Sequence, residues 1–250
     1  EDGATAAESL ANTPILRTRQ GFVPPSRAQL PGHFRDPTGY FELIDTTLFP
    51  PGMDEFARET LGVDVLSFHK YIDEHLPTIL QRNPTREQYR DIIAQIVTRK
   101  NELDDRGSLE RLRGRSFVRT RAGTYARPGN CYFWTAPLAT ILGDDPANWV
   151  DSSWMPPSPI APQLQDLLEA RLGMPVTVTP RHIVDRLEAL AIDGTPDEVA
   201  DRVTPVVRHV IERWSRFGED DLDVFRELQD LQFLPAVVNG ARDPENTYLP

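Results

Sequence analysis

The stretch that decides the fold occurs twice in the chain, as IDTTLFPP at residues 44–51 and as VDSSWMPP at residues 150–157. The two octapeptides agree in residue class at every position, without a gap. Self-similarity at a fixed spacing is the signature of repeat architectures, so we predict a tandem repeat with a unit of about 110 residues.

The match extends in both directions from this block. Upstream, RTRQG at residues 17–21 returns as RTRAG at residues 119–123, and downstream the Leu-Gly pair at 61–62 returns at 172–173. The separation grows from 102 residues at the glycines (123 minus 21) to 111 at the Leu-Gly pairs (172 minus 61). Such drift is what changes in loop length would leave behind.

The matched blocks predict the domain organisation. Residues 1–12 are small, polar and acidic and form a flexible lead. Repeat unit 1 then covers residues 13–113, repeat unit 2 covers 114–228, and residues 229–250 start a truncated third repeat. Because the pattern stops inside a copy, we expect the chain to be a segment of a longer protein.

Each unit is expected to be mostly helical and to begin with a short β-hairpin, which makes the fold class α+β. Residues 15–23 predict two short strands around a turn at Gly21, because glycine tolerates the positive φ that tight turns require. Gly123 and Gly240 hold the equivalent turn position in the later hairpins.

Apolar residues at helical spacing predict the helices that follow. One helix is expected over residues 67–80 with Ser67 as its N-cap, and a second over 86–103, opened by a capping box of Thr85 and Gln88. A third, over 196–214, contains Pro205, which should kink or break it.

The loop-rich segment over residues 33–52 is long enough to need anchors. Its aromatic residues Phe34, Tyr40 and Phe41 are expected to pin it onto the body of the unit.

Composition excludes several classes of protein. The chain is 39% apolar and 26% charged, as soluble globular proteins are, and no apolar run is long enough to make a membrane partner expected. The net charge of -11 disfavours nucleic acid as a partner. The single cysteine, Cys131, rules out an internal disulfide, is expected to be buried, and fits a reducing, cytoplasmic location.

No motif predicts a catalytic, cofactor-binding or metal-binding residue. The five histidines lack metal-ligand spacing, and neither a phosphate-binding glycine loop nor a nucleophile motif is present. Asp45 and Asp151 precede hydroxyl residues, an arrangement typical of turns. Recurrence in both copies favours a role in the fold.

The hairpin arginines are the best candidates for binding. Arg17 and Arg19, like Arg119 and Arg121, alternate onto one face of a strand and could contact an anion or a partner through their guanidinium forks. The interpretation that we favour is salt bridging to the acid-rich helices of the same unit.

A further phrase carries a family resemblance. The sequence FLP at residues 233–235, Gly240 and PENTYLP at residues 244–250 resembles a sacsin-type repeat. In those large proteins, including bacterial relatives, such phrases recur between helices downstream of a GHKL-type ATP-binding domain. The resemblance implies a middle region of an ATP-dependent, chaperone-like or phage-defence protein, with no cofactor in this segment and ATP only in a preceding domain.

Three functions stay open from the sequence. The first is a non-catalytic scaffold that contacts protein partners or other domains of the same chain. The second is an enzyme with an anion site between the two units, lined by the hairpin arginines. The third is a nucleic-acid-binding module that uses the same arginines. We expect this segment not to be catalytic by itself.

Overall fold

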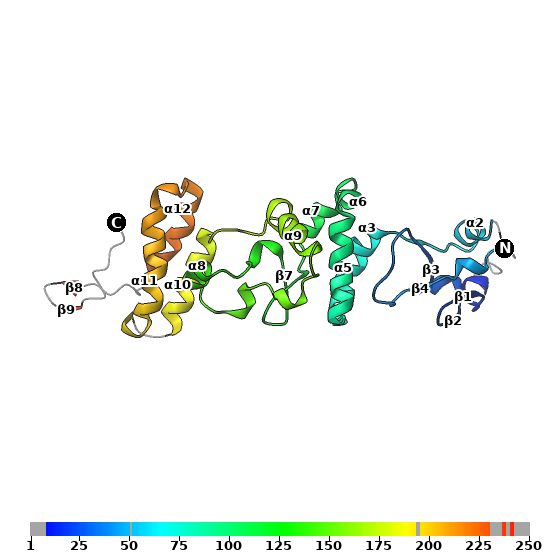
Figure 1. Ribbon diagram of the computed structural model, residues 1–250, viewed down its shortest axis with the longest axis horizontal. Coiled ribbons are helices and arrows are strands. Elements are labelled where there is room, and N and C mark those ends of the chain that lie inside the picture. The colour runs from blue at the N-terminus through cyan, green and yellow to red at the C-terminus, as the bar shows by residue number, and fades with distance from the viewer. Residues whose placement is uncertain (1–8, 51, 194–195, 231–236, 239–240, 243–250) are drawn as a thin grey trace. The chain divides into compact units, whose positions relative to one another are not determined.

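The computed structural model describes residues 9–50, 52–193, 196–230, 237–238 and 241–242 (Figure 1). Helices dominate, and the strands form only small sheets of two or three members, so the predicted α+β class is confirmed. The chain divides into two compact units. Unit 1 comprises Glu1–Phe117 with Ser153–Gly173, and unit 2 comprises Val118–Ser152 with Met174–Pro250.

Unit 1 opens with a hairpin and a small parallel sheet. Strands β1 (Leu16–Thr18) and β2 (Gly21–Val23) pair antiparallel, as the sequence predicts. Strand β3 (Ala28–Pro31) pairs in parallel with both β4 (Glu42–Leu43) and β5 (Val65–Leu66). Their buried side chains form one core, which contains Leu16, Val23, Ala28, Leu30, Ile44, Ala57 and Val63.

The helices of unit 1 are short. They are α2 (Met53–Glu59), α3 (Phe68–Lys70), α4 (Leu76–Gln81), α5 (Arg86–Thr98), α6 (Lys100–Asp104), α7 (Ser108–Arg113) and α9 (Ile160–Asp166). The helix predicted over 67–80 is present, but its middle, Tyr71–His75, is a π-helical turn. Ser67 makes no side-chain cap bond, because its hydroxyl lies 3.4 Å from Nε2 of His69 instead.

Helix α5 begins as predicted and ends early. The Gln88 N–H donates to the Thr85 hydroxyl at 3.2 Å, and the Thr85 N–H donates to Oε1 of Gln88 at 2.8 Å, which confirms the capping box. At Arg99 the backbone leaves helical geometry (φ -108°, ψ 19°), and α6 restarts one residue later. The predicted helix over 86–103 is therefore two helices.

Aromatic contacts hold the segment before α2 in place, as expected. The Phe34 ring centroid lies 5.3 Å from that of Phe68 and 5.1 Å from that of Tyr71. Phe41 contacts Tyr71 at 5.7 Å. The Arg82 guanidinium lies 5.1 Å from the Tyr40 ring centroid. These contacts replace the regular hydrogen bonds that a loop lacks.

Helix α9 belongs to unit 1, although the hairpin and the first helix of unit 2 lie between it and α7 in the sequence.

 

In sequence the segment follows the hairpin of unit 2, yet its contacts are with α5 and α6. The Trp154 and Tyr89 ring centroids lie 5.7 Å apart, and Arg90 donates to the Ser153 carbonyl at 2.8 Å. Arg171 and Asp104 form an ion pair at 2.6 Å. The compact units therefore differ from the predicted boundary at 113/114 in this segment and in residues 114–117, which belong to unit 1.

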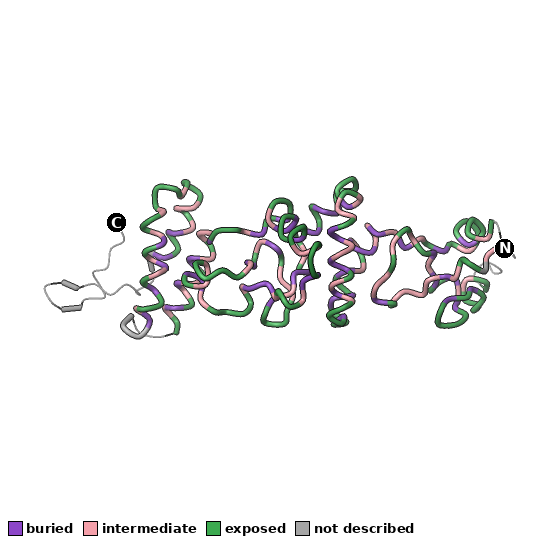
Figure 2. The backbone as a smooth tube through the Cα atoms, in the orientation of Figure 1, coloured by how far each residue is buried: buried purple, intermediate pink, exposed green. Residues whose placement is uncertain are grey.

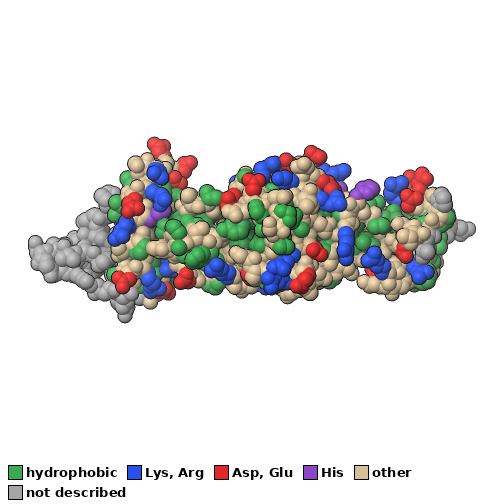
Figure 3. All heavy atoms as spheres, viewed as in Figure 1, with side chains coloured by type: hydrophobic (Ala, Val, Ile, Leu, Met, Phe, Trp, Pro, Cys, Tyr) green, Lys and Arg blue, Asp and Glu red, His purple; other side chains and the backbone are tan. Residues whose placement is uncertain are grey.

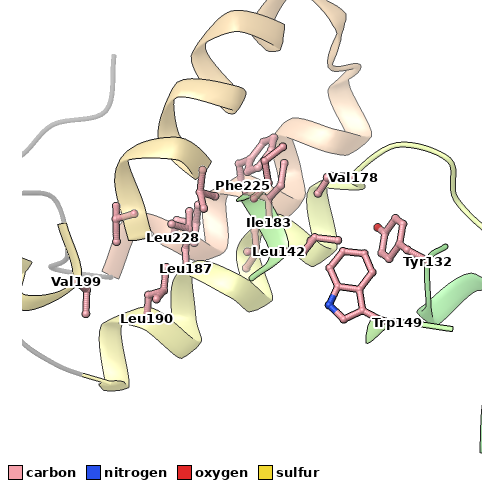
Figure 4. Close-up of a cluster of buried hydrophobic side chains, with 14 residues drawn as sticks. Tyr132, Leu142, Trp149, Val178, Ile183, Leu187, Leu190, Val199, Phe225 and Leu228 are labelled. Carbon is pink, nitrogen blue, oxygen red and sulfur yellow. The ribbon is translucent and has the colours of Figure 1, made fainter. Parts of the chain in front are cut away.

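Unit 2 begins with the antiparallel pair β6 (Val118–Arg119) and β7 (Tyr125–Ala126). Its helices are α8 (Ala136–Leu142), α10 (Pro180–Asp193), α11 (Pro196–Arg213) and α12 (Glu219–Phe225), and β8 (Val237–Val238) pairs with β9 (Ala241–Arg242). The buried positions recur along these helices in Figure 2. They meet in one apolar core, where Leu187 and Leu190 of α10 gather with Phe225 and Leu228 (Figure 4).

Helix α11 continues through Pro205, so of the two outcomes predicted there, a kink or a break, the break is wrong. Proline removes one backbone hydrogen bond from the helix interior. The buried residues Val199, Val203 and Val206 lie on both sides of Pro205 in the unit 2 core. Their burial offsets the lost bond and holds the helix together.

Candidate functional site

The first hairpin presents its arginines to solvent. Arg17 lies opposite Phe22 in the register; both side chains are exposed, Phe22 at 65%. Leu16 and Thr18 flank Arg17 and are buried, because successive side chains of a strand point to opposite faces. Arg19 follows at the turn and is exposed.

The second hairpin lays its arginines across aromatic rings. Arg119 lies opposite Tyr125, and its guanidinium carbon is 5.0 Å from the ring centroid. The guanidinium carbon of Arg121 lies 5.7 Å from the ring centroid of Trp134, which is 45% exposed. Thr120, between the two arginines, is fully buried. Cation–π contacts of this kind fix the direction of the guanidinium groups.

A backbone tether attaches the first hairpin to the Asp45 turn. Thr18 and Ile44 form an isolated antiparallel bridge, and the Asp45 N–H donates to the Arg17 carbonyl at 2.9 Å. The Thr18 hydroxyl donates to the Gly21 carbonyl at 3.1 Å. The octapeptide that opens at Ile44 thus acts as a third strand beside β1.

The second hairpin has the same tether at matching positions. Thr120 and Val150 form an antiparallel bridge, and the Asp151 N–H donates to the Arg119 carbonyl at 2.9 Å. The Thr120 hydroxyl donates to the Thr124 carbonyl at 3.2 Å. Both octapeptides therefore hold the strand that carries an arginine.

The Asp45 carboxylate caps the turn that follows it. Its Oδ1 accepts bonds from the Thr47 hydroxyl at 2.5 Å and from the Thr47 N–H at 3.2 Å. The Thr47 hydroxyl is the largest cause of the lowered pKa of Asp45, and the charges of Arg17 and Arg19 lower it further. The two arginines therefore lie within electrostatic reach of one exposed carboxylate.

The structure brings the predicted arginines together in pairs. Arg17 and Arg19 share the surroundings of Asp45 in unit 1, whereas Arg119 and Arg121 belong to unit 2. In unit 1 the arginines lie near the Asp45 turn, and in unit 2 they lie over the rings of Tyr125 and Trp134.

Gly123 lies between β6 and β7, in the turn predicted for it, whereas Gly21 is the first residue of β2, is paired with Thr18 and follows the turn at residues 19–20. Gly21 has φ 133° and Gly123 has φ 77°, both in the region that favours glycine. Gly240 lies outside the described residues.

A polar network in unit 2 was missed by sequence reasoning. Nδ1 of His182 lies 2.7 Å from the Tyr132 hydroxyl and 2.6 Å from the Thr179 hydroxyl, at the start of α10. Burial lowers the pKa of His182, so the imidazole is neutral. Because Tyr132 lies 50 residues from His182, no local pattern could have joined them.

Unit 1 contains a second network of this kind. Asp73 accepts hydrogen bonds from the Ser108 hydroxyl at 2.7 Å and from Arg111 at 2.6 Å. Burial raises the pKa of Asp73, but the bonds from Arg111 and Ser108 outweigh it and bring the pKa below its usual value. Asp73 lies in the π-helical turn, so this ion pair ties that turn to α7.

These groups offer little for catalysis. Cys131 is fully buried, and burial raises its pKa to about 12, so the thiol stays protonated and is a poor nucleophile. Within the described ranges, no three His, Cys, Asp or Glu side chains cluster closely enough to hold a metal ion. Among the helices described, none has both the length and the apolar character needed to cross a membrane.

The surface between these features carries mixed charge. Acidic and basic side chains are interspersed on the face drawn in Figure 3. What stands out chemically is the repeated pairing of exposed or half-buried arginine with an aromatic ring on each hairpin. No family model, no curated protein and no solved structure matches the chain, so its function must be inferred from these residues.

Proposed function

We propose that this chain is a non-catalytic interaction segment of a larger ATP-dependent, chaperone-like protein. It is built as a tandem repeat of two mostly helical units, each led by a hairpin that offers arginine and aromatic side chains to a partner. The single observation that carries this proposal is the shared tether, in which Asp45 and Asp151 each donate a backbone N–H to the carbonyl of a hairpin arginine at 2.9 Å.

Other matched contacts support the repeat. The Leu61 N–H donates to the Phe56 carbonyl at 3.2 Å, and the Leu172 N–H donates to the Leu167 carbonyl at 3.1 Å. Each leucine precedes a glycine of positive φ, 65° and 75°. Equal backbone geometry at equivalent positions is what duplicated units retain while their side chains diverge.

The hairpins favour an acidic segment of a partner protein. Guanidinium groups bind carboxylates through paired hydrogen bonds, and neighbouring rings add apolar contact. The net charge of -11 opposes binding of a long polyanion such as nucleic acid. We therefore place the partner contact at Arg17, Arg19, Arg119 and Arg121.

Fluorescence anisotropy with two labelled probes tests this assignment. The probes are a peptide rich in Asp and Glu and a single-stranded DNA oligomer of equal charge. We expect the peptide to bind more tightly, and the variant with all four hairpin arginines changed to alanine to bind it about 10-fold more weakly. The matched control is Arg58→Ala with Arg208→Ala, which removes two exposed helix arginines and should change little.

The outcomes separate the alternatives. Tighter binding of the oligomer would support a nucleic-acid-binding module instead. If the control variant loses as much affinity for the peptide as the hairpin variant does, the hairpin arginines are not the binding site. ATP hydrolysis by this chain alone, measured by phosphate release, would contradict the non-catalytic assignment.

A further inference from the structure

Helices α2 and α9 hold equivalent places in the chain. Each precedes a Leu-Gly pair, α2 directly and α9 through the π-helical turn Leu167–Arg171. In both, the leucine N–H donates five residues back, to Phe56 in one case and Leu167 in the other. The residue after that acceptor, Ala57 or Leu168, is buried at 0% or 1% exposed. The inner faces of the two helices are thus alike.

Their outer faces differ in what covers them. Leu164 of α9, the helix that packs against α5, is 2% exposed, and Leu167, the first residue of the π-helical turn that continues α9, is 1% exposed. The equivalent of Leu167 in α2 is Phe56, which is 42% exposed. A large aromatic side chain at a position that is buried in the equivalent helix marks a surface suited to another helix.

The chain carries one helix that matches the role of α5. Helix α11 follows α9 and α10 in the same order in which α5 follows α2 and α4. Near its end the exposed Ile211 is followed by Trp214, which opens the 3-10 turn Trp214–Arg216 directly after the helix. The Trp214 ring also lies 6.2 Å from that of Phe225, so one side of it packs within unit 2. Ile211 is 63% exposed and Trp214 is 47% exposed.

The charges of the two surfaces are complementary. Helix α2 contains three carboxylates, Asp54, Glu55 and Glu59, and a single arginine. Residues 207–216 contain three arginines, at positions 208, 213 and 216, and a single glutamate. Opposite charge around an apolar contact steers the two surfaces together and fixes their orientation.

We propose that the surface of Ile211 and Trp214, at the end of α11, docks on the outer face of α2, around Phe56, in a second copy of this chain. The proposal rests on the repeat relation proposed above. Because the two surfaces are different, the contact is head to tail, and each added copy leaves one surface free. Association should therefore lengthen with concentration and not stop at a dimer.

Sedimentation velocity with two complementary variants tests this geometry. Phe56→Glu removes the α2 surface and Ile211→Glu removes the α11 surface; both residues are exposed, and circular dichroism verifies that the variants fold. The wild-type chain should grow in mean mass as its concentration rises. Each variant alone should remain at 28.3 kDa, with self-association weakened about 10-fold or more.

The mixture is the decisive measurement. Equimolar Phe56→Glu and Ile211→Glu chains retain one intact surface each and should form dimers and nothing larger. Ile192→Glu, which changes an 86% exposed residue of α10, is the matched control and should associate as the wild type does.

Three results would overturn the proposal: a wild-type chain that stays monomeric at every concentration, single variants that associate as the wild type does, or a mixture without dimers. Binding of the acidic peptide is measured on the same samples. If the peptide binds normally while the copies do not associate, only the head-to-tail contact fails and the proposed function stands.

Discussion

The two hairpins share a backbone and differ in their side-chain surroundings. In the first, two residues separate Thr18 from Gly21, and Arg17 and Phe22 are exposed. In the second, the connection between the paired residues Arg119 and Tyr125 is longer, and the arginine lies on the ring. The same tether occurs in both, which teaches that backbone bonds to the Asp turn tolerate changes of loop length and of side chain.

The two units differ most in the burial of the residue that precedes the bridge to the hairpin, Leu43 in unit 1 and Trp149 in unit 2. Trp149 is 1% exposed and donates from Nε1 to the Gly143 carbonyl at 3.2 Å, whereas Leu43, at the equivalent position of unit 1, is half-buried. Trp149→Ala should lower the free energy of unfolding of unit 2 by about 3–5 kcal/mol through the lost burial and the cavity left behind.

Leu43→Ala should cost unit 1 about 1 kcal/mol, because less surface is lost from a partly exposed site. Urea unfolding followed by far-UV circular dichroism measures both values, and hydrogen exchange assigns each loss to its unit. Equal losses in the free energy of unfolding would contradict the expected effect of the difference in burial.

The turn glycines give the next largest effect and compare the hairpins directly. Gly21→Val and Gly123→Val each force a branched side chain into positive φ, and each should cost about 1–2 kcal/mol. A Cβ at Gly123 would lie 3.4 Å from Nη2 of Arg119, whereas a Cβ at Gly21 meets nothing within 4 Å. A contact of 3.4 Å with the mobile end of an arginine is an ordinary one, whereas the φ of Gly21 lies further from the left-handed region than that of Gly123, so we expect the larger loss at Gly21.

Thermal unfolding of the two variants measures this difference. Gly114→Val serves as the control, because Gly114 has negative φ (-81°) and its Cβ would meet only the Arg111 carbonyl, at 3.7 Å. If Gly114→Val is destabilised as much as Gly21→Val and Gly123→Val, the positive φ of the two glycines does not explain their losses.

The smallest effect on stability is expected from a change of pH. It should affect the His182 network of unit 2 and the Asp73 network of unit 1 over different pH ranges. Burial lowers the pKa of His182 from its usual 6.5, so the folded state of unit 2 favours the neutral imidazole. Below pH 6.5 the unfolded chain binds more protons, and this contribution to stability is lost as pH falls through the folded-state pKa. The lowered pKa of Asp73 contributes stability to unit 1 that is lost only below about pH 3.8.

Urea midpoints between pH 7 and pH 5 measure the histidine contribution. The midpoint for unit 2 should fall over this range, and His182→Asn should flatten the fall. His209, whose pKa is lowered by burial and then by Arg213, titrates in the same direction and accounts for the remaining slope. An unchanged slope in His182→Asn would show that the Tyr132 network does not depend on the neutral ring.

The sequence predicted the local features well. The first hairpin and the start of α5 at Thr85 follow from residues close together in the chain. Phe34 and Phe41 were predicted as anchors, but their partners Phe68 and Tyr71 are distant in the sequence and could not be named from it. The end of α5 at Thr98 could not be read in the same way, because apolar spacing continues to Leu103 across the irregular Arg99. Pro205 failed as a predictor of a break because burial of its neighbours outweighs one lost bond.

The candidate site was predicted in its residues and not in its contacts. Arg17, Arg19, Arg119 and Arg121 lie on the hairpins as expected, but whether each meets solvent, a carboxylate or a ring depends on what folds beside it. The Tyr132–His182 network had no sequence signal beyond the Thr179 cap of α10.

By itself, the sequence determined the α+β class, the hairpin positions and the turn glycines, because turns and caps depend on the φ preferences and hydrogen bonds of a few consecutive residues. Only the tertiary structure decided that α9 packs on α5, that Arg90 of α5 bonds to Ser153, 63 residues away, and that Phe56 is exposed while Leu167 is buried. Burial depends on which surfaces meet, and that choice is made by packing over the whole unit.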